Sequence, residues 1–175
     1  MLKNRLGESE RVQLCFYGPE HDVVLQTFYL PTEQEKFTAL PTEVIDLSIQ
    51  DENRYPVVIL NRDTPVGFFV LHDGKDIQSF TNNLNAMLLR ALSINYIHQG
   101  KGYAKKALQL LPKFVMNHFP HINEIVLAVN EKNLAARRLY EKSGFEDRGL
   151  RRFGKIGVQL ILHYPLSNLN QNRIY

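Results

Sequence analysis

The feature that most constrains the fold is a strand, a glycine-rich turn and a helix that follow one another directly in the middle of the chain. Residues 87–97 (MLLRALSINYI) form an apolar run with the length of a central strand, and residues 98–104 (HQGKGYA) supply the turn. Apolar residues then recur at helical spacing over residues 101–118, before a second apolar run at residues 125–129 (IVLAV). A strand, a helix and a strand in this order predict two parallel strands joined by a crossover.

The rest of the chain adds strands on both sides of this unit. Residues 134–142 have a helical pattern that Gly144 ends, and residues 20–50 have the pattern of two or three short helices, broken at Pro31 and Pro41. Further strand-like runs lie at residues 12–17, 55–60, 65–71, 146–152 and 158–164, and the polar residues 72–83 are expected to form a loop. We therefore predict an α/β fold with a mixed central sheet of about seven strands and flanking helices. Two crossovers are expected to make its middle parallel, and hairpins to make its edges antiparallel.

The composition is that of one globular domain, which we expect to span residues 1–175. The chain is 44% hydrophobic, enough for a full core at this length. No run approaches the roughly 18 apolar residues of a membrane span. The first residues (MLKNR) are charged, with no apolar stretch behind them to make a signal peptide. We therefore expect a cytoplasmic protein that binds no membrane, and both a monomer and a homodimer stay open.

Cysteine and charge counts narrow the possible partners. Cys15 is the only cysteine, so an internal disulfide and a Cys-based metal cluster are both excluded, and we expect no metal. The 21 basic residues are interspersed with 18 acidic ones, and the formal net charge is +3. This distribution favours a small phosphorylated ligand over a nucleic-acid backbone.

The turn at residues 98–104 has the features of a phosphate site. A turn between a strand and a helix aims several backbone N–H groups and the positive end of the helix dipole at one point. Gly100 and Gly102 let the backbone approach a ligand, and the small Ala104 continues that approach into the first helical turn. A dinucleotide fingerprint needs a small residue at Lys105, and a P-loop ends in Gly-Lys-Ser/Thr, so neither pattern fits. A tight turn with no ligand is the alternative.

A second motif follows on the later helix, where Ala136, Leu139 and Tyr140 share one face. Together the two segments resemble the GNAT acetyltransferase superfamily. Its signatures are Gln/Arg-x-x-Gly-x-Gly/Ala after the fourth strand and Asn-x-x-Ala-x-x-x-Tyr-x-x-x-Gly-Phe on a later helix. The matching residues are Gln99, Gly102 and Ala104 in the first motif and Asn133, Ala136, Tyr140, Gly144 and Phe145 in the second.

The resemblance implies acetyl-CoA as co-substrate and a role for each matching residue. The CoA pyrophosphate would bind the backbone N–H groups of Gln99, Gly100, Lys101, Gly102, Tyr103 and Ala104. The pantetheine arm would bond to the main chain near Ile94, and Asn133 and Ala136 complete the implied cofactor-binding set. Helix capping is an equal alternative for Asn133. Tyr140 matches the position that protonates the departing thiolate, and its alternative is a core tyrosine.

The implied reaction is direct attack of an amine on the acetyl group, without an acetyl-cysteine, because Cys15 is remote in sequence from both motifs. The acceptor is a small-molecule or peptide amine, which we do not identify further. The resemblance assigns residues of about 20–50 to the acceptor side and of about 87–145 to the acetyl-CoA-binding core. The aromatic and apolar residues Phe28, Tyr29, Phe37 and Leu40 either line a pocket or, as we favour, pack on the sheet.

The general base is not identified. The strand at residues 87–97 has no carboxylate, and none of Glu33, Glu35, Glu43, Asp73 and Asp76 is ranked as catalytic. This absence supports an alternative of the same fold, a CoA-binding regulatory module whose catalytic site has decayed.

A nucleic-acid-binding domain is a second alternative from another class. It would use the arginines of the C-terminal part, which are Arg137, Arg138, Arg148, Arg151 and Arg152. No nucleic-acid reading motif accompanies them, so we expect no nucleic acid as partner.

Overall fold

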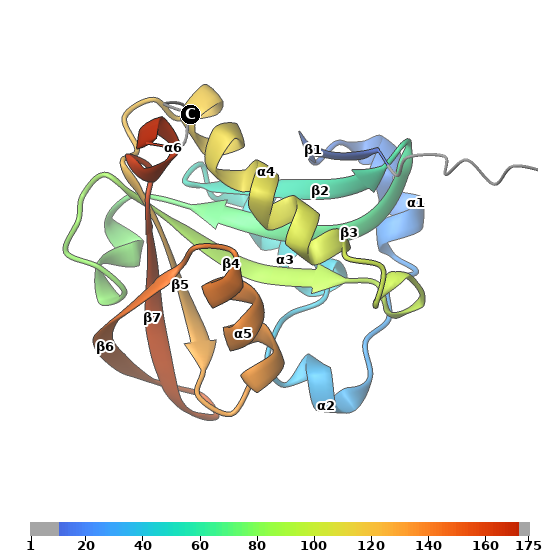
Figure 1. The fold of residues 1–175 in the computed structure, drawn as a ribbon. Coiled ribbons are helices and arrows are strands. Elements are labelled where there is room, and N and C mark those ends of the chain that lie inside the picture. The colour runs from blue at the N-terminus through green and yellow to red at the C-terminus, as the bar shows by residue number, and fades with distance from the viewer. Residues whose placement is uncertain (1–10, 172–175) are drawn as a thin grey trace, which may run out of the picture.

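One seven-stranded sheet organises the chain, in the strand order β1-β2-β3-β4-β5-β7-β6 (Figure 1). The computed structural model describes residues 11–171. The strands are β1 (Val12–Phe16), β2 (Arg54–Asn61), β3 (Thr64–His72), β4 (Ala86–Ile94), β5 (Glu124–Asn130), β6 (Glu146–Gly154) and β7 (Gly157–Pro165). The helices are α1 (Asp22–Leu25), α2 (Thr32–Glu35), α3 (Pro41–Gln50), α4 (Tyr103–His118), α5 (Leu134–Lys142) and α6 (Asn168–Gln171). The mixed sheet with flanking helices confirms the predicted fold class.

The first predicted crossover is confirmed, because β4 and β5 pair in parallel and α4 connects them. The second crossover does not give a parallel pair, since β7 lies between β5 and β6 and is antiparallel to both. Burial explains this order. The middle of β7 is apolar and buried at Leu160, Ile161 and Leu162, whereas β6 is mostly exposed. The apolar strand therefore occupies the inner position and the polar strand the edge.

Helices cover both faces of the sheet (Figure 1). On one face α4 packs on the strands through Ala107, Leu108, Leu111 and Val115, in a cluster that also contains residues of β2 to β5 and β7. On the other face Leu25, Phe28 and Ile45 from the α1 and α3 region pack on Val58, Phe68 and Val70. Within residues 11–171, no helix is long and apolar enough to cross a membrane.

Three of the differences from the sequence prediction concern the turns that flank β4 and α4. β4 ends at Ile94 rather than at residue 97, because Tyr96–His98 form a 3-10 turn, η3, and the Asn95 N–H bonds to the Val66 carbonyl. α4 begins at Tyr103 rather than at residue 101, since Gly102 has a left-handed backbone. The expected loop at residues 72–83 contains a short 3-10 helix, η2 (Lys75–Ser79). The η3 turn and the turn at Gly102 place residues 94–104 around the end of β4.

Candidate active site

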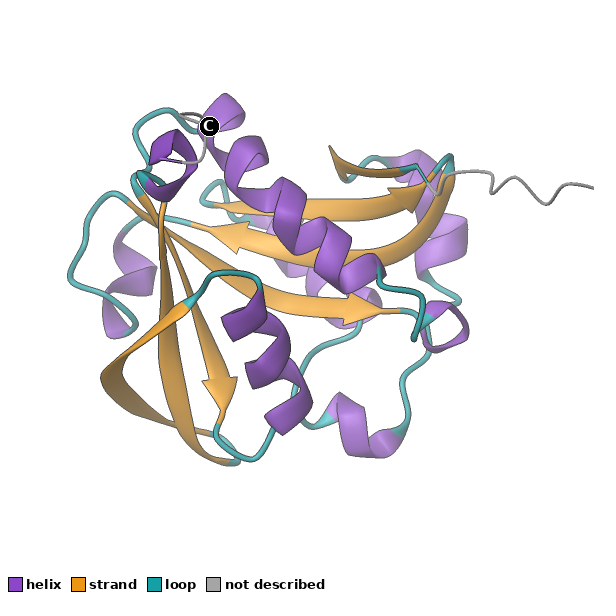
Figure 2. Ribbon diagram, in the orientation of Figure 1, coloured by secondary structure: helices purple, strands orange, loops and turns teal. Residues whose placement is uncertain are grey.

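β4 and β5 diverge after pairing over only four residues, from Ala86 opposite Glu124 to Leu89 opposite Leu127 (Figure 2). A bulge contributes to this divergence. Three steps along β4, from Arg90 to Ser93, lie opposite two steps along β3, and Ala91 in the bulge has a φ of 54°. Because a bulge bends its strand and increases the local twist, the end of β4 turns away from β5.

A cleft of about 520 Å³ opens where the two strands separate. Its lining residues are Leu30, Gln34, Phe37 and Thr38 from α2 and its flanks, Leu89 to Ile94 from β4, His98 to Gly100 and Gly102 to Lys105 from the turn and α4, Ala128 to Asn130 from β5, and Asn133, Ala135, Ala136, Leu139 and Tyr140 at α5. The cleft therefore brings together the two sequence motifs and the segment around α2.

Nine of the ten predicted site residues line this cleft: Ile94, Gln99, Gly100, Gly102, Tyr103, Ala104, Asn133, Ala136 and Tyr140. The tenth, Lys101, is exposed and is not among the lining residues. Tyr103 contributes through its backbone, because its side chain is buried in the core and its hydroxyl accepts a hydrogen bond from Asn61 Nδ2 at 2.9 Å.

The turn before α4 presents unpaired backbone donors to the cleft. Gly102 precedes the helix, and within residues 11–171 no side chain caps the N-terminus. The N–H groups of Tyr103, Ala104 and Lys105 precede the first intrahelical bond, which runs from the Lys106 N–H to the Gly102 carbonyl. Gly100 and Gly102 have φ values of 74° and 81°, and a Cβ on either would meet no atom within 4 Å. The backbone angles therefore favour glycine at both positions, and a Cβ at either would lie in open space.

The side chain of Gln99 has structural partners. Its Nε2 donates to the carbonyl oxygen of Ile94 at 3.0 Å and to Oε1 of Gln34 at 2.8 Å, and Gln34 Nε2 donates back to its Oε1 at 3.2 Å. Thr38 Oγ1 similarly donates to the Leu92 carbonyl at 3.0 Å. These bonds fix the α2 segment against β4 and the turn.

The second motif places a phenol and a capping residue beside the same cleft. Asn133 Oδ1 accepts the Ala136 N–H at 3.3 Å, so Asn133 caps α5 as its alternative interpretation predicted. Tyr140 is half-buried, and its ring lies 5.9 Å from the buried ring of Phe145. Desolvation raises the pKa of Tyr140 to about 12, because burial disfavours the phenolate. The hydroxyl therefore keeps its proton at neutral pH.

Among the described residues, the cleft lining contains no carboxylate. Of the acids considered from sequence, Glu33 and Glu35 are exposed on α2, while Glu43 caps the start of α3 by accepting the Leu40 N–H. The titratable side chains that do line the cleft are basic or phenolic, and Arg90, His98 and Lys105 are the basic ones. The pKa of His98 is lowered, mainly because the ring is buried and also because Lys101 is positively charged.

Sequence reasoning missed several lining residues, most notably Arg90. The signal was present, since Arg90 is the one charged residue in the apolar run of residues 87–97. In the early segment, Phe28 and Leu40 pack in the core on the α1 and α3 face, as favoured, whereas Phe37 lines the cleft. Tyr29 is exposed and meets Tyr96 edge to face.

Cys15 lies away from the cleft, on the edge strand β1. Its side chain packs on the α1 and α3 face, with Sγ 3.8 Å from His21 Nε2. Burial raises the pKa of the thiol, so it stays protonated at neutral pH.

Comparison with known families gives a match over most of the fold. The model of the acetyltransferase (GNAT) family matches residues 22–145. An uncharacterized N-acetyltransferase of Bacillus subtilis strain 168, YbbJ, is 52% identical over 159 residues, which cover 90% of this chain and 99% of YbbJ.

Solved structures with the same fold include two kinds of acetyltransferase. The aminoglycoside acetyltransferase AAC(6')-Ib, in complex with coenzyme A and kanamycin, has a TM-score of 0.75 and 19% identity, covering 93% of this chain and 99% of that one. A chimera of the spermidine N-acetyltransferase SpeG of Vibrio cholerae has a TM-score of 0.68 and 18% identity, covering 91% and 98%. At these identities the two structures show the common fold.

Proposed function

Because this chain belongs to the GNAT acetyltransferase family, we propose that it transfers the acetyl group of acetyl-CoA directly to an amine in the cleft between β4 and β5. The observation that carries the proposal is that both sequence motifs meet at this cleft, where the strands separate. The coenzyme A in the AAC(6')-Ib complex supports acetyl-CoA as the co-substrate.

In this proposal the turn holds the CoA pyrophosphate. The free N–H groups before and within the first turn of α4 supply donors, and the helix dipole adds positive potential at the same place. Lys101 and Lys105 are exposed beside the turn and add charge. The pantetheine arm then bonds to the β4 main chain near Ile94, on the edge that β5 leaves unpaired. Ala136 packs beside it, and Asn133 takes part through the amide hydrogens that its capping oxygen leaves free.

The reaction proceeds in a ternary complex. The amine nitrogen attacks the acetyl carbon, the resulting oxyanion is held by a backbone N–H near Ile94, and the carbon–sulfur bond breaks. Tyr140 gives its phenolic proton to the departing thiolate, and its pKa of about 12 keeps this proton on the phenol at neutral pH until the thiolate forms. Since no described carboxylate lines the cleft, the proton lost by the amine leaves through water.

A decayed CoA-binding module of the same fold is the rival hypothesis, and an activity assay separates the two. Purified protein is incubated with acetyl-CoA and a panel of amines, and free thiol release is measured together with the acetylated product. We expect turnover with at least one amine. Acetyl-CoA binding without turnover across neutral, cationic and anionic amines supports the rival.

The broader assignments follow from this function. We place one domain over residues 1–175 in the cytoplasm, with a small-molecule or peptide amine as its partner. Nucleic acid is disfavoured as a partner because four of the five arginines considered for it have other contacts, and one of the four is Arg152, which donates to Gln159 Oε1 at 2.9 Å. Arg148 pairs with Glu124 at 2.7 Å, Arg151 pairs with Asp147 at 2.8 Å, and Arg137 donates to the Glu131 carbonyl.

A further inference from the structure

We propose that the amine acceptor also carries an anionic group, a carboxylate or a phosphate, and that Arg90 binds this group inside the cleft. The inference rests on the proposed acetyltransferase function and specifies the class of its acceptor.

Arg90 is a half-buried cation that lacks a carboxylate partner among residues 11–171. It lies on β4 immediately before the bulge, and it lines the cleft. Its one hydrogen bond in that part of the chain is from Nη1 to His72 Nδ1, at 3.1 Å. A guanidinium has five donors, so several remain for a ligand. Because a partly desolvated charge without a counter-ion is unfavourable, a bound anion would stabilise this site.

The charges around Arg90 add to its attraction for an anion. The pKa of Arg90 is lowered by burial and by the positive charges of Arg54 and Arg152. Asp51 is the one acid that acts on Arg90, and it is already paired with Arg54 at 3.0 Å. Arg152 donates to Gln159 Oε1 at 2.9 Å and lies 4.1 Å above the Phe80 ring, so it too is held without a carboxylate. The resulting positive potential favours an anionic group.

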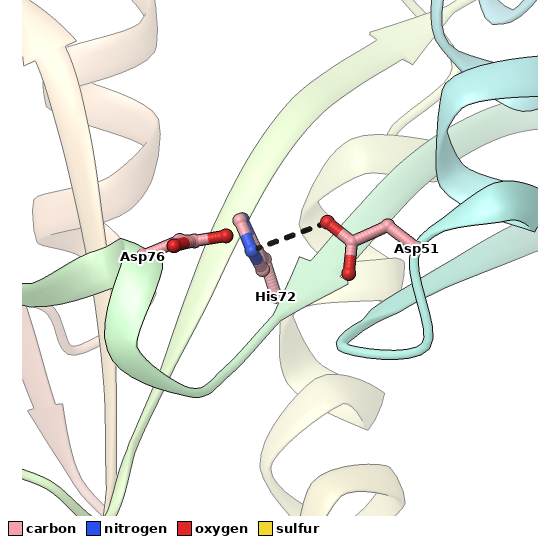
Figure 3. Close-up of side chains that lie close together, drawn as sticks. All are labelled: Asp51, His72 and Asp76. Carbon is pink, nitrogen blue, oxygen red and sulfur yellow. Dashed lines mark ion pairs between the residues drawn. The ribbon is translucent and has the colours of Figure 1, made fainter.

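His72, which bonds to Arg90, lies between two acidic side chains, Asp51 and Asp76 (Figure 3). The ligating atoms of Asp51, His72 and Asp76 lie within 4.8 Å of one another, a spacing that also suits a metal ion. The hydrogen bond from Arg90 decides against a metal. Arginine only donates, so His72 Nδ1 accepts and the proton of the neutral ring is on Nε2, the atom 3.9 Å from Asp51 Oδ2. Nε2 then has no lone pair for a metal, and its N–H faces the Asp51 carboxylate without a hydrogen-bond partner among the described residues.

This charge arrangement is opposite to what a polycationic acceptor requires. Several ammonium groups need acidic partners, and none of the described lining residues is acidic. An amine that carries a carboxylate or a phosphate brings an anionic group for Arg90 and an amine for the acetyl group. Aminoglycosides and spermidine, the compounds named with the structural neighbours, lack such a group.

Matched amine pairs test the inference. Initial rates are measured for γ-aminobutyrate against butylamine, L-lysine against cadaverine, and phosphoethanolamine against ethanolamine, with spermidine and kanamycin as polycations. We expect kcat/KM to be at least about tenfold higher for an anionic member than for its neutral or cationic counterpart, as for a charge-assisted hydrogen bond. The pairs also separate a carboxylate from a phosphate. Equal values within all pairs, or a preference for the polycations, overturn the inference and leave the acetyltransferase function intact.

Variants assign the preference to Arg90. Arg90→Gln is expected to lower the ratio within the preferred pair by about ten- to a hundredfold, and Arg90→Lys by less, since it keeps the charge. Arg11→Gln is the matched control, because Arg11 is exposed just before the edge strand β1 and the ratio should not change. If Arg90→Gln does not fold, Arg152→Gln on the edge strand β6 takes its place, and an unchanged ratio in that variant overturns the inference.

A binding measurement separates this inference from the proposed function. N-acetyl-γ-aminobutyrate and N-butylacetamide are titrated calorimetrically into the protein saturated with CoA. Selective binding of the carboxylate that Arg90→Gln removes supports the inference even if no amine is acetylated, in which case the proposed function alone fails. No preference for a carboxylate or a phosphate in turnover, together with no carboxylate selectivity in binding, overturns the inference.

Discussion

Gln34 and Gln99 exchange two side-chain hydrogen bonds, of 3.2 and 2.8 Å, across 65 residues of sequence. Gln34 lies on α2 and Gln99 on the turn before α4, and both line the cleft. Gln99 also donates to the Ile94 carbonyl. The pair therefore connects the α2 segment to the end of β4.

A double-mutant cycle measures this connection. We expect Gln34→Ala and Gln99→Ala each to destabilise the protein, with a coupling free energy of about 0.5–1.5 kcal/mol because each removes the same two bonds. Urea denaturation of the two single variants and the double variant gives the value. Gln99→Ala should be the more destabilising, since it also loses the bond to Ile94. Strictly additive effects would contradict the contact.

We expect acetyl-CoA binding to require Gly102 for its lack of a side chain as well as for its left-handed backbone. In Gly102→Ala a methyl group is added in open space at a residue that lines the cleft, so the rise in melting temperature on adding acetyl-CoA should become much smaller. The substitution also has a cost without ligand. An alanine at a φ of 81° is destabilising by about 1–2 kcal/mol, and a valine by more, so alanine is the better probe.

Gly149→Ala is the matched control for this experiment. Gly149 has a φ of 86° and open space at its Cβ position, but it lies on β6 and does not line the cleft. Both variants should lose similar stability without ligand, whereas only Gly102→Ala should lose the shift produced by acetyl-CoA. Equal shifts in the two variants would remove the turn from the proposed site.

Local patterns predicted the parts of the site that depend on local geometry. The turn is recognised from a strand followed by two glycines, and the α5 motif from one face of a helix. These patterns are visible in residues 87–145. The acceptor-side lining was harder to predict. Gln34 and Thr38 reach the cleft through bonds to residues 65 and 54 positions away, and no periodicity encodes such pairs.

Two other features of the fold depend on competition between distant segments. β7 lies between β5 and β6 because β7 is the more apolar of the two last strands. This difference predicts the strand order only after both strands have been assigned to the same sheet. The bulge at Ala91 has no sequence signal, because a left-handed backbone at alanine is unfavourable in isolation. Arg90 was visible in an apolar strand, but its role depends on His72 from the neighbouring strand.

Tyr140→Phe tests the proposed proton donor. We expect kcat to fall by roughly ten- to a thousandfold with little change in the acetyl-CoA thermal shift, because the ring still packs and only the hydroxyl is lost. Tyr164→Phe is the control, since Tyr164 packs on the same Phe145 ring at 5.5 Å without lining the cleft. Its kcat should be unchanged. An equal loss in both variants would assign the effect to packing, and no loss in either would mean that water protonates the thiolate.

The kinetic order and the pH profile test direct transfer together. A protonated amine with a pKa of about 10.4 cannot attack, so kcat/KM for the amine should rise between about pH 6 and 9. Because the pKa of Tyr140 is about 12, loss of its proton should not lower the rate within this range.

Cys15→Ala should keep full activity, since the thiol is protonated and packs on the α1 and α3 face. Initial-rate plots against both substrates should intersect, as a ternary complex requires. Parallel plots together with an acetylated Cys15 in the mass spectrum would indicate a covalent route instead.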